Sequence, residues 1–503
     1  MPIYALPLLT IKMTENLMTL MLKDKSLIKT QAYIDGQWIS ADSGETVPVI
    51  NPATSEIIVE VPKCGTAETR RMIEVASVAQ KAWAKTTAKE RAALLRKWFN
   101  LIVENQEDLA QLLTAEQGKP LAEARGEIAY GANYVEWFSE ESKRVYGDII
   151  APPSADKRIM VIKQPVGVVA CITPWNFPNA MLTRKIAPAI AAGCAVVCKP
   201  ANATPLSAMA LMALAERAGF PKGLVNLVTG RTAEIGAEIT GNPKVRKVTF
   251  TGSTPVGKQL IAECAETVKR TSMELGGNAP FIVFDDADID AAVQGALVSK
   301  YRNAGQTCVC SNRLIIQAGI YDEFASRLAE AVKKLTLGNG ADEGVTVGPL
   351  IDEQAATGVC EFIDDAVAKG AKVTLGGGRS SLGGSFIEPT VLTNVNQSMR
   401  VFSEEIFGPV APLFKFETEE QVVQMANDTE FGLAAYFYSR DIGRVYRVAE
   451  QLEYGIVGVN EGIISNEMAP FGGIKESGSG REGSKYGMDD YMDIKYICMG
   501  GID

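Results

Sequence analysis

The chain of 503 residues is too long for one hydrophobic core, so we expect two or three domains. Hydrophobic residues make up 47% of it, as in ordinary globular enzymes, and 60 acidic against 50 basic residues leave a net charge of −10. This balance argues against a nucleic-acid partner, because affinity for a polyanion depends on clustered Lys and Arg. The sequence has no histidine, which excludes Cys-His and Ser-His dyads and His-ligated zinc.

Nine scattered cysteines show no disulfide spacing, which favours a reducing, cytoplasmic location. No run of about 18 apolar residues is present, so we expect no membrane span. Residues 1–30 lack the basic segment and the cleavage site of a signal peptide, and we expect them to form a flexible N-terminal extension.

The first regular elements are expected after residue 30. Asp35 and Gly36 lie between apolar positions and predict a β-hairpin turn. Thr87 and Glu90 fit the capping box that begins a helix. Gly118 predicts the end of a later helix.

Residues 146–165 break the helical pattern and carry an isolated strand at 158–163. Such an excursion is typical of a subunit-interface arm and equally of a surface hairpin. A strand-like stretch at 492–498 ends the chain, and we expect it to pair with a partner subunit.

Continuous apolar runs alternate with helical segments and predict the buried strands of a parallel, doubly wound sheet. These runs lie at 166–173, 194–198, 223–228 and 245–250. Ligands of such sheets bind beyond the carboxyl ends of the strands. Three of these ends carry residues suited to a nucleotide: Asn176 between two prolines, Lys199, and a glycine-rich turn at 252–257 that opens a helix.

The second half repeats the alternation of strand and helix and predicts a second α/β domain. Helices are expected to begin near Asp288, Tyr321, Asp352, Glu419 and Asp441. Strands are expected near 313–317, 371–375, 433–438 and 455–460.

Two residues are candidates for covalent and acid–base chemistry. Cys308 lies at a helix-to-strand turn and is a candidate nucleophile, although most free cysteines are buried hydrophobic residues. Glu274 precedes two glycines and is an available general base in a chain without histidine.

Six motifs then occur in a set order: Pro-Trp-Asn-Phe-Pro at 174–178, Lys-Pro-Ala at 199–201, Phe-Thr-Gly-Ser at 250–253, Glu-Leu-Gly-Gly at 274–277, Gly-Gln-Thr-Cys at 305–308 and Glu-Glu-Ile-Phe-Gly-Pro at 404–409. Together they resemble the aldehyde dehydrogenase superfamily from about residue 31 to the C-terminus. The stretches 303–310, 462–466 and 481–487 most resemble its bacterial succinate-semialdehyde dehydrogenases.

The resemblance implies an α/β fold with three parts. A Rossmann-like parallel-sheet cofactor domain would comprise 31–145 and 166–273, and an α/β catalytic domain would comprise 274–475. A small β oligomerisation arm would comprise 146–165 and 476–503. It also implies a homo-oligomer, either a dimer or a tetramer.

The resemblance also implies catalytic roles. The thiolate of Cys308 would attack the aldehyde, Asn176 would stabilise the oxyanion, and Glu274 would activate water, with no metal. A non-catalytic relative that keeps only the fold is the remote alternative, and the presence of all three residues argues against it.

The cofactor implied is NADP or NAD, held by Thr173, Pro174, Trp175, Lys199, Asn202, Gly252, Ser253, Gly257, Leu275, Glu405 and Phe407. Lys199 would contact the adenosine ribose or its 2′-phosphate, Ser253 the pyrophosphate, and Glu405 the nicotinamide ribose. NAD-preferring relatives often carry Glu where this chain has Asn202. The missing carboxylate favours NADP and leaves NAD open.

The substrate implied is an aldehyde with a distal carboxylate, bound by Arg184, Arg302 and Ser465. A guanidinium suits a carboxylate, although either arginine taken alone is more typical of a structural charge. Succinic semialdehyde is expected, and glutaric or another ω-carboxylated semialdehyde is the alternative, because one methylene discriminates by only about 10–200-fold.

Cys310 is a possible redox partner of Cys308, with simple packing as the alternative. If the two thiols form a disulfide, peroxide should inactivate the wild type in a way that dithiothreitol reverses. Cys310→Ala should not show this reversible inactivation. Equal behaviour of both proteins in an activity assay would contradict the prediction.

Overall fold

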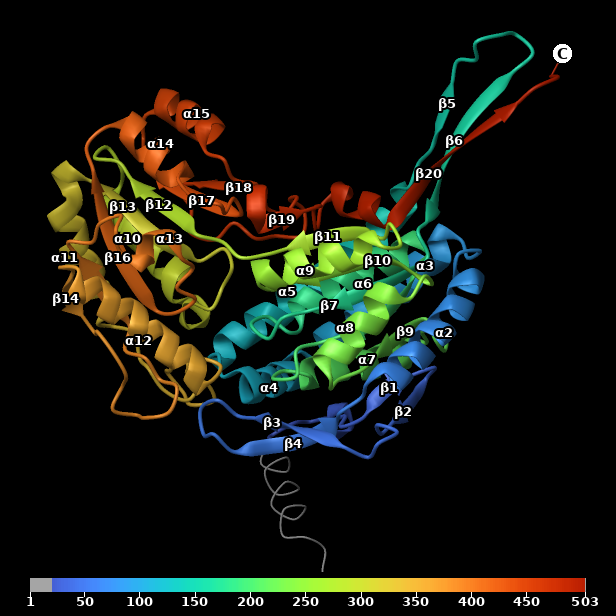
Figure 1. Cartoon of the computed structure of the whole chain (residues 1–503), viewed down its shortest axis with the longest axis horizontal. Coiled ribbons are helices and arrows are strands. Elements are labelled where there is room, and N and C mark those ends of the chain that lie inside the picture. The colour runs from blue at the N-terminus through green and yellow to red at the C-terminus, as the bar shows by residue number, and fades with distance from the viewer. Residues whose placement is uncertain (1–19, 503) are drawn as a thin grey trace, which may run out of the picture.

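The computed structural model describes residues 20–502, which form two α/β bodies and a projecting arm (Figure 1). The first body is built on an eight-stranded sheet with the order β19-β11-β10-β7-β8-β9-β1-β2. Its strands are β1 (Ala32–Ile34), β2 (Gln37–Ile39), β7 (Val168–Ile172), β8 (Ala195–Lys199), β9 (Val225–Leu227), β10 (Val245–Thr251), β11 (Arg270–Glu274) and β19 (Gly478–Ser479).

The five central strands of this sheet are parallel, as the apolar runs predicted. The chain moves one way from β7 to β9 and the other way from β10 to β11. Right-handed crossovers therefore put the connecting helices on opposite faces, and β7 beside β10 marks the point where the direction changes. The helices of this body are α2 (Thr66–Trp83), α3 (Ala88–Glu104), α4 (Gln106–Gln117), α5 (Leu121–Glu141), α6 (Ala180–Ala192), α7 (Leu206–Ala218), α8 (Thr232–Gly241) and α9 (Thr254–Ala265). A separate hairpin joins β3 (Thr46–Ile50) to β4 (Ile57–Pro62).

The second body contains a seven-stranded sheet with the order β14-β15-β16-β13-β12-β17-β18. Its strands are β12 (Ala279–Val283), β13 (Ser311–Gln317), β14 (Lys372–Leu375), β15 (Thr390–Thr393), β16 (Val410–Phe416), β17 (Ala434–Tyr438) and β18 (Ile456–Val459). All neighbours are parallel except β14, which runs antiparallel at one edge. Its helices are α10 (Ile289–Tyr301), α11 (Tyr321–Val332), α12 (Glu353–Ala368), α13 (Arg400–Ser403), α14 (Glu419–Asn427) and α15 (Ile442–Gln451).

The expected helix starts of the second half are confirmed. Asp288, Asp352 and Asp441 cap α10, α12 and α15 by accepting a backbone N–H three residues on. In the first half, Thr87 and Glu90 form the predicted capping box of α3. Each of these side chains satisfies an N–H that has no partner within its own helix.

Two inner strands of the second sheet, β15 and β16, are absent from the predicted set. β15 has only four residues, too few for a clear pattern. β16 contains Pro412, which removes a donor and argues against a central strand. Tertiary packing overrides both signals.

The arm consists of β5 (Asp148–Ile150), β6 (Arg158–Pro165) and β20 (Met492–Met499), and the C-terminal end of the chain lies near its tip (Figure 1). β20 pairs along its whole length with β6 of the same chain, so the expected pairing with a partner subunit is corrected on that edge. Ile149, Ile494 and Tyr496 are 91%, 73% and 61% exposed. Such exposure of large apolar side chains is typical of an interface.

The N-terminal extension predicted over residues 1–30 ends earlier than expected. The N–H groups of Lys23 and Asp24 donate to the Asp108 carboxylate at 2.9 and 2.8 Å, and Leu27 is fully buried. These contacts hold residues 23–27 against α4 and α7, while the part of the prediction before residue 20 lies outside the described residues. Among residues 20–502, no helix has the length and hydrophobicity needed to cross a membrane.

Candidate active site

Cys308 lies on the short loop between α10 and β13, where the helix-to-strand turn was predicted. The backbone before it is left-handed at three successive residues, with φ of 53° at Asn303, 54° at Ala304 and 76° at Gly305. Left-handed residues with a side chain cost about 1–2 kcal/mol each, so the loop needs outside support. A Cβ on Gly305 would lie 2.1 Å from the Gly408 carbonyl oxygen, which explains the glycine.

A hydrogen-bond network joins this loop to the segment after β7. The Asn176 side-chain amide donates to the Gln306 carbonyl at 3.0 Å. The Asn303 side-chain amide donates to the carbonyls of Asn176 and Gln306 at 3.1 and 3.0 Å. These bonds fix the predicted oxyanion donor relative to the nucleophile loop.

Lys119, just before α5, and Glu127, within α5, hold the segment that contains Asn176. Lys119 donates from Nζ to the Asn176 carbonyl at 2.7 Å and to Glu127 at 2.6 Å. Glu127 in turn accepts the N–H groups of Asn179 and Ala180 at the start of α6. Both charges are buried, and the Lys119 ammonium also lies 3.9 Å from the centre of the Phe177 ring. A buried pair with this many partners resists rearrangement.

Two cavities meet at Cys308. One has a volume of about 290 Å³ and the other about 270 Å³, and Phe177, Met181 and Cys308 line both. A molecule in either cavity can therefore reach the thiol, which is partly exposed. This arrangement suits two reactants that approach one sulfur from different sides.

The second cavity collects most of the predicted cofactor residues. It is lined by Pro174, Trp175, Asn176, Gly252, Ser253, Glu274, Leu275, Glu405 and Phe407. They come from the carboxyl ends of β7, β10 and β11 and from the loop before β16. The cavity therefore opens at the point where the strand order reverses, as expected for a doubly wound sheet.

Two observations indicate that this region fits a dinucleotide. No side chain caps α9, so the N–H groups of its first turn are available to a phosphate beside Ser253. Lys199 is buried without an ion pair or side-chain hydrogen bond to any described residue, and this burial lowers its pKa to about 8. A buried ammonium without a counter-charge suits an anionic ligand.

Like Lys199, three further predicted cofactor residues do not line the cavity. Thr173 is buried, and its hydroxyl has no hydrogen-bond partner among the described residues. The Asn202 amide is occupied by Gly230, donating to its carbonyl at 2.7 Å and accepting its N–H at 3.1 Å. Gly257 lets α9 approach Leu275, because a Cβ there would lie 2.4 Å from that side chain.

The first cavity contains all three predicted substrate residues, Arg184, Arg302 and Ser465. The two arginines differ in environment. Arg184 is buried and forms an ion pair at 2.7 Å with Glu482, a carboxylate that it shares with Lys185. Arg302 is partly exposed, lies over the Phe177 ring and forms no ion pair with a described residue.

Burial is the largest cause of the pKa shifts of Cys308 and Glu274. Burial raises the pKa of Cys308 to about 12, with Glu405 adding to the rise and Arg184 opposing it. Burial and the nearby Glu482 raise the pKa of Glu274 well above its ordinary value, and Arg184 opposes this shift. One Glu274 oxygen is buried without a hydrogen-bond partner, as suits a carboxyl that awaits a water or a proton.

Glu405 is the second carboxyl in the cofactor cavity. It accepts the Gly277 N–H at 3.2 Å, and burial raises its pKa to about 8. The residues from 20 to 502 contain no cluster of Cys, Asp and Glu suited to a metal ion.

Cys310 points away from the substrate cavities. Its thiol donates to the Lys300 carbonyl at 3.4 Å and the side chain is buried, while both Cys308 and Cys310 are free. A disulfide between them would require the loop to rearrange, so the redox pairing stays a prediction.

Several residues of the site were not predicted from sequence. Lys119 and Glu127 belong to a helix stop and a helix face, with no motif to distinguish them. Glu482 lies in the stretch 481–487, which carried part of the resemblance but gave this residue no role. β19 pairs with β11 and brings Glu482 beside Arg184 and Lys185. Only this long-range pairing shows that Glu482 belongs to the site.

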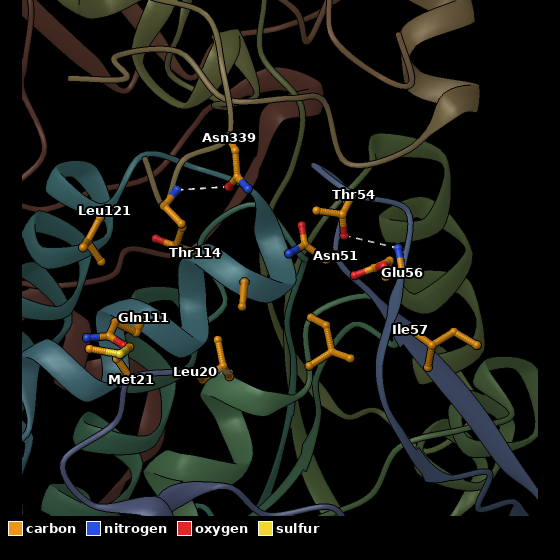
Figure 2. A pocket seen from close by; sticks show the side chains of 13 residues that line it. Leu20, Met21, Asn51, Thr54, Glu56, Ile57, Gln111, Thr114, Leu121 and Asn339 are labelled. Atoms are coloured by element: carbon orange, nitrogen blue, oxygen red, sulfur yellow. Dashed lines mark hydrogen bonds between the residues drawn. The ribbon is translucent and has the colours of Figure 1, made fainter. Parts of the chain in front are cut away.

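A cavity of about 450 Å³ lies elsewhere, between the β3–β4 hairpin, α4 and the loop at Asn339 (Figure 2). It shares no lining residue with the two cavities at Cys308. Its lining contains no Lys or Arg to hold an anion and no thiol. We therefore assign the chemistry to Cys308.

Comparison with known proteins agrees with this geometry. The family model described as "Aldehyde dehydrogenase family" matches residues 38–497. The chain belongs to the aldehyde dehydrogenase family. It is an aldehyde oxidoreductase that uses NADP or NAD. The predicted superfamily and the α/β fold are confirmed.

Three curated aldehyde dehydrogenases are similar over nearly their full length. A 3-sulfolactaldehyde dehydrogenase of Pseudomonas putida is 64% identical, covering 96% of this chain and 99% of its own. A glutarate-semialdehyde dehydrogenase of Pseudomonas aeruginosa is also 64% identical, covering 96% and 100%. An NADP(+) succinate-semialdehyde dehydrogenase of Escherichia coli is 60% identical, covering 95% and 99%.

The fold agrees with a solved relative as well. The crystal structure of a succinate-semialdehyde dehydrogenase from Burkholderia pseudomallei is 61% identical, with a TM-score of 0.95. The match covers 95% of this chain and 100% of that chain.

The buried thiol predicts a pH dependence of its alkylation. Because the pKa of Cys308 is raised to about 12, the thiol is protonated near neutral pH and its thiolate fraction grows with pH. The rate of iodoacetamide addition to Cys308 in the cofactor-free protein should rise about tenfold per pH unit between roughly pH 7 and pH 10. Mass spectrometry of the Cys308 peptide measures the rate, and Cys308→Ser identifies adducts at other cysteines. A plateau already at about pH 8 would contradict the prediction.

Proposed function

We propose that this aldehyde dehydrogenase oxidises succinic semialdehyde to succinate with NADP as its preferred cofactor. The observation that carries the proposal is Arg302, a guanidinium that lines the cavity ending at Cys308 and forms no ion pair with a described residue. A distal carboxylate in that cavity would place an aldehyde carbon toward the thiol, with Ser465 as a further polar contact.

The first chemical step is attack of the Cys308 sulfur on the aldehyde carbon, forming a thiohemiacetal oxyanion. Two donors are free to hold that oxyanion. The Cys308 N–H makes no hydrogen bond to a described residue, and the Asn176 amide uses only one of its two N–H groups, on Gln306. Losing one such donor costs about 10²–10³-fold in rate.

Glu274 is the proposed general base. Its raised pKa lets it take a proton near neutral pH, either from the thiol or from the water that hydrolyses the thioester. When bound, the nicotinamide supplies the hydride acceptor, and Glu405 and Phe407 line the cavity in which it would lie. Trp175 packs edge-on against Phe407 and excludes water from that side.

NADP is proposed over NAD because of Lys199 and Asn202. The Lys199 ammonium has no counter-charge, and the Asn202 amide is tied to Gly230 and carries no charge. A 2′-phosphate would therefore meet a cation and no repelling carboxylate. The similar Escherichia coli enzyme, which is named for NADP(+), supports this choice.

A second candidate substrate is glutaric semialdehyde. The similar Pseudomonas aeruginosa enzyme is named for glutarate semialdehyde, and one additional methylene is a small change for a cavity of about 290 Å³. The Pseudomonas putida relative is named for 3-sulfolactaldehyde, so this compound belongs in the same test.

We further propose a cytoplasmic homo-oligomer that assembles through the arm of β5, β6 and β20. The nine free cysteines support a reducing compartment, and the exposed apolar side chains of the arm support assembly. Light scattering of the purified protein would measure whether it is a dimer or a tetramer.

The test of the function is a matrix of aldehydes against both cofactors, read as absorbance of reduced nicotinamide. Succinic semialdehyde with NADP should give the highest kcat/KM, glutaric semialdehyde should be within about 10–200-fold, and butanal should be lower. A higher kcat/KM with butanal than with either semialdehyde would contradict the proposal.

Arg302→Ala separates carboxylate binding from catalysis. The change should raise KM for succinic semialdehyde by about tenfold or more, because a charge-assisted hydrogen bond contributes about 1.5–3 kcal/mol. KM for butanal should change little, since butanal has no carboxylate. Equal losses with both aldehydes would contradict the role. Arg184 is less suitable for this test because its ion pair with Glu482 is structural.

Lys199→Ala tests the cofactor choice. Loss of the ammonium should raise KM for NADP by about tenfold or more and leave KM for NAD nearly unchanged. Steady-state kinetics with each cofactor at saturating aldehyde measure both values. Lys333→Ala, a change of an exposed lysine at the C-terminal end of α11, is the matched control and should change neither. An equal rise of KM for NADP and for NAD would show that Lys199 does not distinguish the 2′-phosphate.

A further inference from the structure

Glu123 is a carboxylate in a cavity that is proposed to take an anion. It lies in the first turn of α5 and lines the cavity with Arg302 and Cys308. Among the described residues, no ion pair links it to Arg302 or to any other cation. Burial raises the pKa of Glu123, while the charges of Lys119 and Arg302 favour its charged form. A negative charge there opposes a second carboxylate, so its presence needs a structural reason.

The reason lies in one hydrogen bond. A Glu123 carboxylate oxygen accepts the backbone N–H of Asn303 at 2.8 Å. Asn303 begins the left-handed turn before Cys308 and directly follows Arg302 in the chain. The N–H of a residue in this turn has no helical or strand partner, and Glu123 provides its acceptor.

The same turn orients both reactive ends of the cavity. Beyond it, the Asn303 side chain holds the carbonyls of Asn176 and Gln306, and Gln306 leads into Cys308. Before it, Arg302 leaves the end of α10 and lies against Phe177. A shift of the Asn303 backbone would therefore move the guanidinium and the sulfur relative to each other.

We propose that Glu123 is a positioning residue that fixes the Asn303 turn and, through its negative charge, limits how tightly the cavity binds the distal carboxylate of the substrate. The two effects are separable, because hydrogen-bond acceptance requires only an oxygen, whereas repulsion requires the charge. The charge effect rests on the proposed function, and the positioning effect does not.

Two substitutions separate the effects in the full-length enzyme. Glu123→Gln keeps an acceptor oxygen and removes the charge, so kcat should stay within about twofold while KM for succinic semialdehyde falls about threefold to tenfold. KM for butanal should not change. Glu123→Ala removes the acceptor as well, and kcat should fall about tenfold or more with both aldehydes, because a buried N–H is left without a partner.

Glu136→Gln is the matched control. Glu136 is a carboxylate on the same helix that pairs with Arg96 outside the cavity, and its change should alter neither KM nor kcat. Thermal unfolding of each variant shows that the protein remains folded at the assay temperature.

The outcomes are distinct. Equal kinetics of Glu123→Gln and Glu123→Ala would overturn the positioning role, because the acceptor oxygen would then have no effect. A change of KM in Glu123→Gln that is the same for butanal and succinic semialdehyde would overturn the charge role. If the wild type prefers butanal, the proposed substrate fails, while the loss of kcat in Glu123→Ala with butanal still decides the positioning role.

Discussion

The site depends on two backbone carbonyls that join its two halves. The Asn176 carbonyl accepts from Lys119 and Asn303, and the Gln306 carbonyl accepts from the Asn176 and Asn303 side chains. Asn176 belongs to the loop that follows β7 of the first sheet, whereas Gln306 belongs to the loop that precedes β13 of the second sheet. Because reacting atoms must be held to within a fraction of an ångström, this network is what makes a nucleophile and an oxyanion donor on separate sheets into one site.

Burial sets the chemistry of this site. It raises the pKa of Cys308, Glu274 and Glu405 together, so an otherwise ordinary thiol and carboxyl pair can exchange a proton without a histidine. Buried cations limit these shifts, chiefly Arg184. The same low-dielectric surroundings strengthen every charge in the substrate cavity, which is why a single guanidinium at Arg302 or a single carboxylate at Glu123 is expected to affect selectivity measurably.

Local patterns in the sequence agree closely with the structure where an element depends only on residues a few positions apart. The caps at Asp288, Asp352 and Asp441, the capping box at Thr87 and the buried parallel strands all depend on short-range spacing, and all are present. Prediction failed at Pro412, where tertiary packing places a proline within an inner strand. The pairing of the C-terminal strand with its own β6 is likewise a contact that no local pattern indicated. The hydrogen bonds that hold residues 23 and 24 to Asp108 are a further tertiary contact that no local pattern predicts.

The sequence by itself determined the family and the α/β class, and it predicted the nucleophile, base and oxyanion donor, because these depend on residue types in ordered motifs. Only the tertiary structure decided which charged side chains of the site are paired and which are available to a ligand. It pairs Arg184 with Glu482 and gives Arg302 no ion pair with any residue from 20 to 502, although the resemblance implied the same role for both. It also brings Glu123 to Asn303, 180 positions away, and Lys119 to Asn176, 57 positions away, through contacts that no local spacing encodes. The physical reason is that a charge acts through its distance and burial, and both are properties of the folded chain.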